Sequence, residues 1–204
     1  MIADIKQKEA LLAKAVPSAM SLRWLSAISG IATGDTVIDL QFDGSAERIA
    51  ALTAADSPLC IVHSVLNTCS SLPANFVRIN AWPGFGQHSV IEAACGNTAL
   101  QSTATAALAT LGLQPKWVAD IPGFLSARVV AMIINEAFYT LQEEVSTREA
   151  IDTAMKLGTN YPYGPFEWCS MIGAEHVFAL LSLLAKTEKR YTPAEGLQKE
   201  ATQS

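Results

Sequence analysis

Short apolar runs alternate with polar or alanine-rich stretches over the first 120 residues, and this alternation is typical of strands and helices that follow one another. Helices are predicted at 46–54, after the turn Asp43-Gly44-Ser45, and from Asn97 to Leu111. Residues 1–34 are predicted to form a helix that ends in a glycine loop. Strands are predicted at 36–42, 59–63, 76–80, 89–93 and 116–119. Such an order favours a mainly parallel sheet with helices on its faces.

The pattern changes near residue 120, after which only helical periodicity is found. The segment 124–144 carries two apolar stripes, so we expect a helix that is buried on several sides. The residues of the first stripe are Val129, Ile133, Ala137 and Leu141, and those of the second are Val130, Ile134 and Phe138. Ser146-Thr-Arg-Glu149 has the form of a capping box, which predicts a helix that ends at Gly158.

The remaining helices are marked by proline and glycine. Gly164-Pro165 predicts the start of a short helix that Gly173 ends, and His176–Lys189 predicts another. The polar residues after Pro193 are expected to be loose. The sequence therefore predicts an α/β domain over residues 1–120 and an all-α bundle of about four helices over 121–204.

Composition and charge exclude several functions. The chain has 204 residues, of which 50% are hydrophobic, so it can bury a sizeable core. Its 14 basic and 19 acidic residues include no basic cluster, which argues against nucleic acid or an anionic membrane surface as a partner. The first residues mix both charges, unlike a signal peptide, and the uncharged stretch 93–114 contains too many polar residues for a membrane span. We expect a cytoplasmic protein.

The cysteines and histidines show no metal-ligand spacing. The cysteines stand at 60, 69, 95 and 169 and the histidines at 63, 88 and 176, without a C-x-x-C pair. We therefore assign no metal site, and we expect buried thiols in a reducing compartment.

Three blocks in the second half resemble a known family. They are Asp120-Ile-Pro-Gly-Phe-Leu-Ser-Ala-Arg128 with Asn135-Glu-Ala137, Ile151-Asp-Thr-Ala-Met-Lys-Leu-Gly158, and Tyr161-Pro-Tyr-Gly-Pro-Phe-Glu167. In this order and spacing they resemble the signature of the 3-hydroxyacyl-CoA dehydrogenases. Upstream, the family's sequence is matched more weakly by Thr36–Asp39, Asn67–Leu72 and Val90–Glu92.

The resemblance implies a fold and a chemistry. The fold would be a shortened Rossmann-like sheet followed by the family's carboxyl-terminal helical domain. The chemistry would be oxidation of a 3-hydroxyacyl-CoA by NAD in acyl-CoA and fatty-acid metabolism, with a His–Glu pair that takes the hydroxyl proton.

The family's catalytic positions are only partly matched. Glu92 matches the catalytic glutamate, whereas a gapless count places Asn80 at the histidine. The serine of the family's Asn-Thr-Ser-Ser loop maps to Cys69 or, with a one-residue insertion, to Ser70. His63, at the end of an apolar strand, is a candidate replacement base or a structural histidine. These five residues are the candidate catalytic set.

Two further departures from the family's pattern weaken the expectation of catalysis. A one-residue shift of the count would place Ala81 at the histidine, and Ala127 stands where the family has an asparagine that contacts the reacting group. A strand would hold His88 about 13 Å from Glu92, too far for direct pairing.

No phosphate-binding loop is found before Asp35, where the family's dinucleotide fold has G-x-G-x-x-G between its first strand and helix. Gly84-Phe-Gly86 is the one G-x-G, and it leads into a predicted strand. Residues 1–34 replace the family's first βαβ unit, so we expect NAD binding to be impaired and assign no cofactor-binding residue.

Two functions follow as alternatives. The first is a 3-hydroxyacyl-CoA dehydrogenase-like protein that is impaired in NAD binding and catalysis. The second is a non-catalytic homodimer that binds an acyl-CoA or related small molecule or serves in assembly. The apolar helix 125–144 favours a dimer unless the monomer buries it. Four aromatic residues either line an acyl pocket or pack the core: Tyr161, Tyr163, Phe166 and Trp168.

Overall fold

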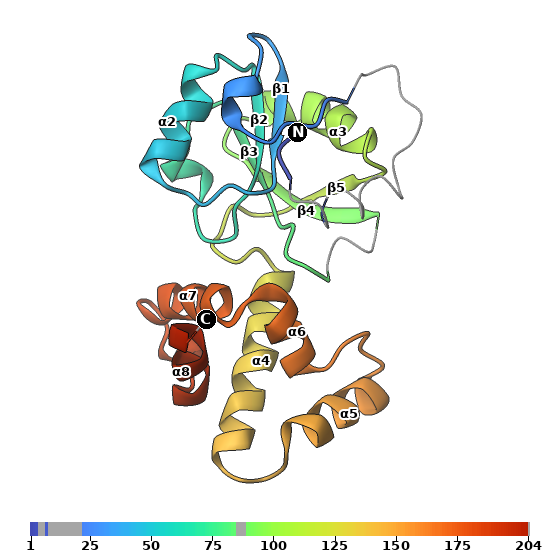
Figure 1. Cartoon of the computed structure of the whole chain (residues 1–204), viewed down its shortest axis with the longest axis vertical. Helices are drawn as coiled ribbons and strands as arrows, with labels where there is room; N and C mark the ends of the chain where they lie inside the picture. Colours follow the sequence, from blue (N-terminus) through green and yellow to red (C-terminus); the bar gives the residue numbers. More distant parts are fainter. Residues whose placement is uncertain (4–6, 8–21, 85–88, 204) are drawn as a thin grey trace. The chain divides into compact units, whose positions relative to one another are not determined.

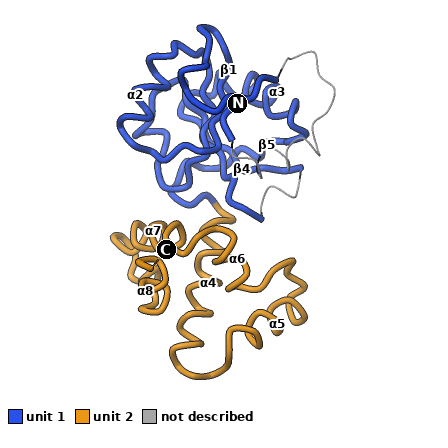
Figure 2. Tube along the Cα trace, in the orientation of Figure 1, with its two compact units in different colours: residues 1–124 blue, residues 125–204 orange. Residues whose placement is uncertain are grey.

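The computed structural model describes residues 1–3, 7, 22–84 and 89–203. The chain divides into two compact units, residues 1–124 and residues 125–204 (Figure 2). The first unit is built on a sheet and the second from helices (Figure 1), which confirms the predicted fold class.

A five-stranded sheet forms the centre of the first unit, with its strands in sequence order. The strands are β1 (Thr36–Asp39), β2 (Leu59–His63), β3 (Phe76–Ile79), β4 (Val90–Cys95) and β5 (Gln114–Trp117). Three pairings are parallel, and only β3 and β4 run antiparallel. Only residues 80–89 lie between these two strands, and a parallel connection needs about a dozen residues or more, which favours the antiparallel pairing. The prediction of a mainly parallel sheet is confirmed.

The first residues of the chain lie along the edge of this sheet. The Ile2 N–H donates to the Ile38 carbonyl at 2.8 Å, and the Leu40 N–H donates to the Ile2 carbonyl at 2.9 Å. Met1 and Ile2 are buried. Among residues 22–34 only the 3₁₀ turn η1 (Ile28–Gly30) is helical. The predicted helix is therefore wrong for residues 1–3 and 22–27, where Ile2 pairs with β1 and the Leu25 N–H donates to the Met1 carbonyl. The remainder of the predicted helix lies mostly outside the described residues, and a loop follows as predicted near Gly30 and Gly34.

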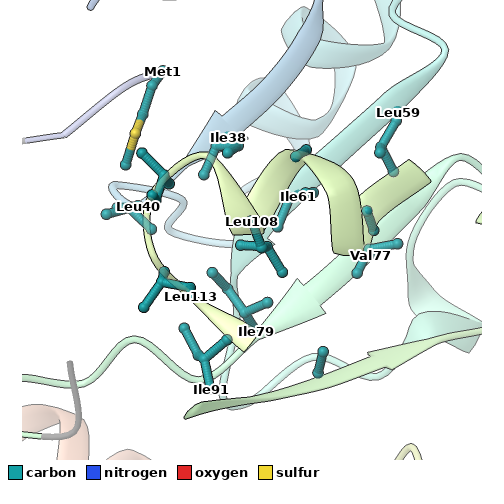
Figure 3. Packing of buried hydrophobic residues seen from close by; sticks show 14 residues of the cluster. Met1, Ile38, Leu40, Leu59, Ile61, Val77, Ile79, Ile91, Leu108 and Leu113 are labelled. Atoms are coloured by element: carbon teal, nitrogen blue, oxygen red, sulfur yellow. The ribbon is translucent and has the colours of Figure 1, made fainter. Parts of the chain in front are cut away.

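Helices α2 (Ala46–Ala54) and α3 (Gln101–Ala109) each pack against a different set of strand residues. Strand side chains alternate between the two faces of a sheet. Leu52 of α2 packs with Cys60 and Val62, and Leu108 of α3 packs with Leu59 and Ile61 (Figure 3). The strands are therefore apolar on both faces. Asn97 caps the 3₁₀ turn η3 (Thr98–Leu100) that precedes α3, where a cap was predicted.

The second unit contains helices α4 (Ser126–Gln142), α5 (Arg148–Thr159), α6 (Pro165–Ile172), α7 (Ala174–Ala185) and α8 (Glu195–Gln203), with the 3₁₀ turn η4 (Lys189–Tyr191). The expectation of a loose tail after Pro193 is wrong, because Leu197 of α8 is fully buried. Asn135 of α4 also accepts a hydrogen bond from the Ala194 N–H at 2.8 Å. These contacts hold α8 in the core although its own sequence is mostly polar.

Helix α5 begins one residue later than a capping box at Ser146 requires. Thr147 is the cap, and its hydroxyl accepts a hydrogen bond from the Ala150 N–H at 3.3 Å. Since Ala150 then occupies the position where a capping box needs Glu or Gln, the predicted reciprocal pair with Glu149 does not form. The helix ends as predicted at a turn near Gly158, where Asn160 adopts a left-handed conformation.

The two apolar stripes of α4 differ in burial. Val130, Ile134 and Phe138 are buried within the second unit, whereas Val129 is 49% exposed. Leu125, just before the helix, is 67% exposed. Among the described residues, no single helix is long and apolar enough to cross a membrane, and α6 and α7 reach that length only together, across a bend of 98°.

Candidate functional site

Asn80 and Glu92 face each other at the end of the antiparallel β3–β4 pair. The Asn80 amide Nδ2 donates to the Glu92 carboxylate at 3.2 Å, and their backbones are also bonded. The Asn80 carbonyl Oδ1 accepts a hydrogen bond from the Trp82 N–H at 3.2 Å, and the side chain is buried. The structure thus brings together the two positions that the sequence matched to the family's His–Glu pair. An amide at this place cannot serve as a general base, because it does not take up a proton near neutral pH.

His63 lies apart from this pair. It is paired with Ile79 in the register of β2 and β3, so its side chain projects to the face that carries Ile79, whereas Asn80 projects to the other. The His63 Nδ1 accepts a hydrogen bond from the Ala81 N–H at 3.0 Å. The backbone therefore fixes the tautomer in which Nδ1 carries no proton, and the structure does not place His63 as a base beside Glu92.

Cys69 and Ser70 lie in the serine loop, which we define as residues 67–72. The loop contains the 3₁₀ turn η2 (Cys69–Ser71) and follows β2 along the chain. The Cys69 backbone N–H donates to the Asp120 carboxylate at 2.8 Å. Ser70 is exposed, and its hydroxyl lies 2.8 Å from that of Thr68. Ser70 is therefore the more accessible of the two candidate residues in the loop.

Burial, and after it the charge of the neighbouring Asp120 carboxylate, raise the pKa of the Cys69 thiol to about 12. The thiol is consequently protonated at neutral pH and is a poor nucleophile. Cys60 and Cys169 are buried thiols, as expected, whereas Cys69 and Cys95 are partly exposed.

Arg78 is a site residue that the sequence reasoning missed. Its side chain is fully buried, and it shares a sheet face with Asn80, which directly follows β3 and is two positions from Arg78. Its guanidinium donates to the Asp120 carboxylate at 3.0 Å and to the Ile121 carbonyl at 3.0 Å. The available signal was a charge inside the apolar run 76–79, where the strand pattern predicts burial.

The turn at residues 120–124 is held on three sides. The Gly123 N–H donates to the Val65 carbonyl at 2.7 Å, which ties the turn to the chain leaving β2. The Arg78 guanidinium lies 3.9 Å from the centre of the Phe124 ring. Phe124 has a positive φ of 50°, a conformation that a bulky residue adopts only when its surroundings impose it.

The other signature residues stabilise the helical unit. Asp152 is buried and accepts hydrogen bonds from the Phe166 and Glu167 N–H groups at 2.8 and 3.2 Å, so it caps α6 from a different helix. A Cβ on Gly164 would lie 2.3 Å from this carboxylate, so glycine is needed there. Ala127, at the position where the family has an asparagine, is fully buried.

Aromatic residues of this unit pack against one another. Trp168 is buried, and its ring centre lies 5.5 Å from that of Tyr161 and 6.2 Å from that of Tyr163. Phe166 packs edge-on against Phe138 at 5.1 Å. These contacts supply packing within the unit.

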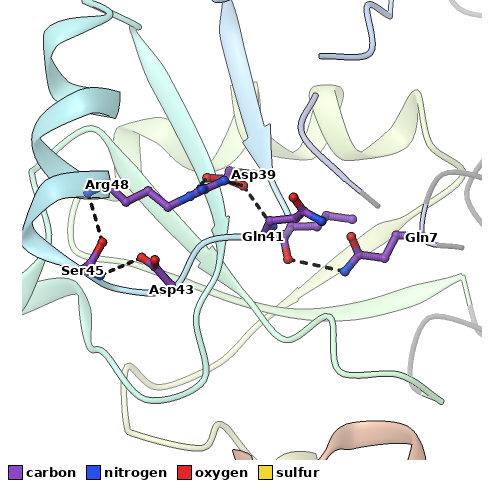
Figure 4. Close-up of polar contacts among 7 residues, drawn as sticks. Gln7, Asp39, Gln41, Asp43, Ser45 and Arg48 are labelled. Carbon is purple, nitrogen blue, oxygen red and sulfur yellow. Dashed lines mark hydrogen bonds and ion pairs between the residues drawn. The ribbon is translucent and has the colours of Figure 1, made fainter. Parts of the chain in front are cut away.

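The described residues at the end of β1 do not fit a dinucleotide pyrophosphate. The Arg48 N–H of α2 donates to the Ser45 hydroxyl at 3.1 Å, and the Ser45 N–H donates to the Asp43 carboxylate at 2.9 Å (Figure 4). The hydrogen bond from Ser45 lowers the pKa of Asp43, so a negative charge already stands at the helix N-terminus. Asp39 is buried in a two-fold contact with Arg48 at 2.8 and 2.9 Å. A phosphate here would meet a carboxylate in place of unpaired N–H donors.

No group of three or more potential metal ligands occurs among the residues that the structure describes.

The first unit combines a mainly parallel α/β sheet with a polar cluster of Asn80, Glu92, Arg78 and Asp120, and the second unit is a helical domain. This architecture is a Rossmann-type fold followed by a carboxyl-terminal helical domain.

Comparison with known proteins defines the family. Residues 123–203 match the model of the 3-hydroxyacyl-CoA dehydrogenase, C-terminal domain. The chain is 32% identical over 181 residues to a probable 3-hydroxybutyryl-CoA dehydrogenase of Bacillus subtilis, covering 79% of this chain and 63% of that protein. It is 48% identical over 86 residues to the 3-hydroxyadipyl-CoA dehydrogenase of Escherichia coli, covering 41% and 18%. The chain belongs to the 3-hydroxyacyl-CoA dehydrogenase family and spans less than two thirds of these relatives.

Solved structures agree with this assignment. The (S)-3-hydroxybutyryl-CoA dehydrogenase PaaH1 from Ralstonia eutropha is similar in fold, with a TM-score of 0.74 at 22% identity, covering 89% of this chain and 70% of that one. The 3-hydroxybutyryl-CoA dehydrogenase from Escherichia coli is 33% identical with a TM-score of 0.64, covering 72% and 32%.

Proposed function

We propose that this chain is a cytoplasmic 3-hydroxyacyl-CoA dehydrogenase-like protein of acyl-CoA and fatty-acid metabolism that is impaired in NAD binding and in catalysis. The observation that carries the proposal is the pair of Asn80 and Glu92. It occupies the place that the family resemblance gives to a His–Glu pair, and its amide is engaged at both ends.

Oxidation of a hydroxyl group requires that its proton be taken up while the hydride leaves. Asn80 cannot take up this proton, and Glu92 is already accepting a hydrogen bond from the Asn80 amide. Loss of a positioned general base costs a factor of about 10² to 10⁴ in rate. The carboxylate of Asp43, just before α2, supports the proposal that NAD binding is impaired, since its negative charge disfavours a phosphate at this helix.

The test is a restored pair. We expect no oxidation of NADH above background by the wild-type chain with acetoacetyl-CoA. Asn80→His should give a measurable rate only at high NADH concentration, because the weak binding of the coenzyme remains. The double variant Asn80→His/Glu92→Gln is the matched control, because it keeps the new imidazole and removes the carboxylate that would orient it. Turnover by the wild type at a rate typical of enzymes, which is about 10 per second, contradicts the proposal.

A second candidate is a non-catalytic homodimer that binds acyl-CoA or a related ligand or serves in assembly. The observation that favours it is the exposed apolar pair before and on α4, since Leu125 is 67% exposed and Val129 is 49% exposed. The two positions are four apart, so a second copy of the helical unit could cover both side chains together.

Sedimentation of the wild type and of Leu125→Glu/Val129→Glu tests this candidate. We expect a wild-type dimer and a monomeric variant, with Leu157→Glu as a control, because Leu157 on α5 is 83% exposed and distant in sequence. Calorimetry with acetoacetyl-CoA and with NAD separately then distinguishes the two functions. Binding of the acyl-CoA without turnover by either Asn80 form supports the second.

A further inference from the structure

Arg78 is an unusual residue for the interior of a sheet. The side chain is fully buried, and its partner Asp120 is 28% exposed. Its Nε has no hydrogen-bond partner within the part of the chain that the structure describes. Buried ion pairs give little net stability, and an unpaired buried donor is unfavourable. Stability of the core therefore does not explain an arginine at this position.

Asp120 connects Arg78 to the serine loop. One carboxylate oxygen, Oδ1, accepts the Arg78 hydrogen bond at 3.0 Å, and the other, Oδ2, accepts the Cys69 backbone N–H at 2.8 Å. The carboxylate therefore bridges β3 and the start of the 3₁₀ turn η2. These residues are separated from Asp120 by 42 and 51 positions in the sequence, so the bridge joins three distant segments.

Arg78 also fixes the turn that carries Asp120. It donates to the Ile121 carbonyl, and its guanidinium covers the ring of Phe124, whose backbone has a strained positive φ. A guanidinium can do this because it is planar and presents several N–H donors in a fixed fork, while its face stacks on an aromatic ring. A lysine or an apolar residue offers only part of this set.

We propose that Arg78, acting through Asp120, is a positioning residue of the candidate site: it fixes the serine loop beside β3, where Ser70 is exposed to contact a ligand of the acyl-CoA type. This inference rests on the proposed function for the identity of the ligand. Arg78 itself is buried and does not touch the ligand. Its effect is transmitted by the bond between the Asp120 carboxylate and the Cys69 N–H.

The experiment compares Arg78→Met, which keeps the approximate volume, with Arg78→Lys, which keeps the charge. Arg48→Met is the matched control, because it breaks another arginine–aspartate pair of the same unit, that with Asp39. Amide hydrogen exchange of the serine loop is measured for each variant, with α2 and α5 as internal references. Calorimetry with acetoacetyl-CoA is carried out on the same samples.

We expect amide exchange at Cys69 to be about tenfold faster in Arg78→Met, because a hydrogen bond to a charged group is worth at least that factor. Acetoacetyl-CoA affinity should fall in parallel. Arg78→Lys should restore both in part, because it keeps the charge but not the fork, and Arg48→Met should leave the serine loop unchanged. If Arg78→Met fails to fold, Asp120→Asn tests the same bridge, since its single carbonyl oxygen can accept from Arg78 or Cys69 but not both strongly.

Equal behaviour of Arg78→Met and Arg78→Lys would overturn the inference, because it would mean that volume alone matters. A loosened loop with unchanged acetoacetyl-CoA affinity would overturn it as well. Failure of the wild type to bind acetoacetyl-CoA would instead count against the proposed function, and the exchange data would still decide whether Arg78 holds the loop.

Discussion

Gly164 and Asp152 offer a quantitative test of how the helical unit is held together. Asp152 caps α6 with two hydrogen bonds from backbone N–H groups that have no partner inside their own helix. Replacing it by glycine should cost about 4 kcal/mol, since the cap is lost, a buried N–H is left unpaired and a glycine enters the interior of α5. Gly164→Ala should cost about 2 kcal/mol for a different reason, because the new methyl group meets the carboxylate.

The backbone at Gly164 is extended, with φ of −76° and ψ of 164°, so alanine is not strained there by its own conformation. The Cβ would lie 2.3 Å from the Asp152 carboxylate and 2.4 Å from the Asp152 Cβ, and these contacts are the whole cost. An alanine at position 152 would keep its Cβ, so the double variant that removes the obstacle is Asp152→Gly/Gly164→Ala. The two changes should therefore destabilise the unit by about 4 kcal/mol together, not 6, which is a coupling of about 2 kcal/mol.

Urea unfolding of the wild type, both single variants and the double variant measures this coupling, with amide exchange of α6 to show that the helical unit is the part that responds. Thr153→Ala is a suitable control on α5, because its side chain is exposed. If the two single effects add to within about 0.5 kcal/mol, the clash is not the reason for glycine at this position and the reasoning fails.

Three further predictions concern caps, packing and thiols. In urea unfolding, Thr147→Ala should lower stability by about 1 kcal/mol and Ser146→Ala should have little effect, because only the threonine caps α5. A larger loss of stability in Ser146→Ala would instead support a capping box that begins at Ser146. Leu197→Ala should cost about 2 to 5 kcal/mol and release α8 to rapid amide exchange, since this side chain is fully buried; a slow-exchanging α8 would contradict that. The pKa values of Cys69 and Cys169 are raised to about 12 from 9.0, so the unfolded chain loses these protons first and stability should fall as pH rises above 9. The double variant Cys69→Ser/Cys169→Ser should lose less stability as the pH rises, as measured by urea unfolding at several pH values above 9. An equal loss of stability in the wild type and the double variant would contradict the raised pKa values of the two thiols.

The sequence predicted the regular elements well wherever the signal was local. Leu59–His63 and 46–54 form the expected strand and helix, because an apolar run or a capping serine acts within its own segment. Helix α8 was missed for the opposite reason. Its polar sequence gives no signal of its own, and it is ordered by the burial of Leu197 and by the bond from Asn135 to Ala194.

The candidate site was predicted in part. A gapless count from Glu92 put Asn80 at the family's histidine position, and a one-residue shift put Ala81 there. The structure brings Asn80 into contact with Glu92, because the antiparallel register of β3 and β4 continues to these two residues. The role of Arg78 could not be predicted, since a charged side chain is buried in a strand only when it pairs with another group, and the partner Asp120 is distant in the sequence. His63 was proposed as a replacement base because it lies at the end of a strand. The register of β2 and β3 instead places its side chain on the sheet face opposite to that of Asn80.

The sequence by itself determined the order of strands and helices from β1 to α7, the change of architecture near residue 120 and the glycine and proline positions that begin and end α6. These features depend on backbone preferences and on apolar periodicity, both of which act over a few neighbouring residues. The tertiary structure alone decided which polar groups meet. Asp120 reaches Arg78 and Cys69 across separations of 42 and 51 residues, and the pairing of buried charges over such distances is set by the packing of the whole sheet.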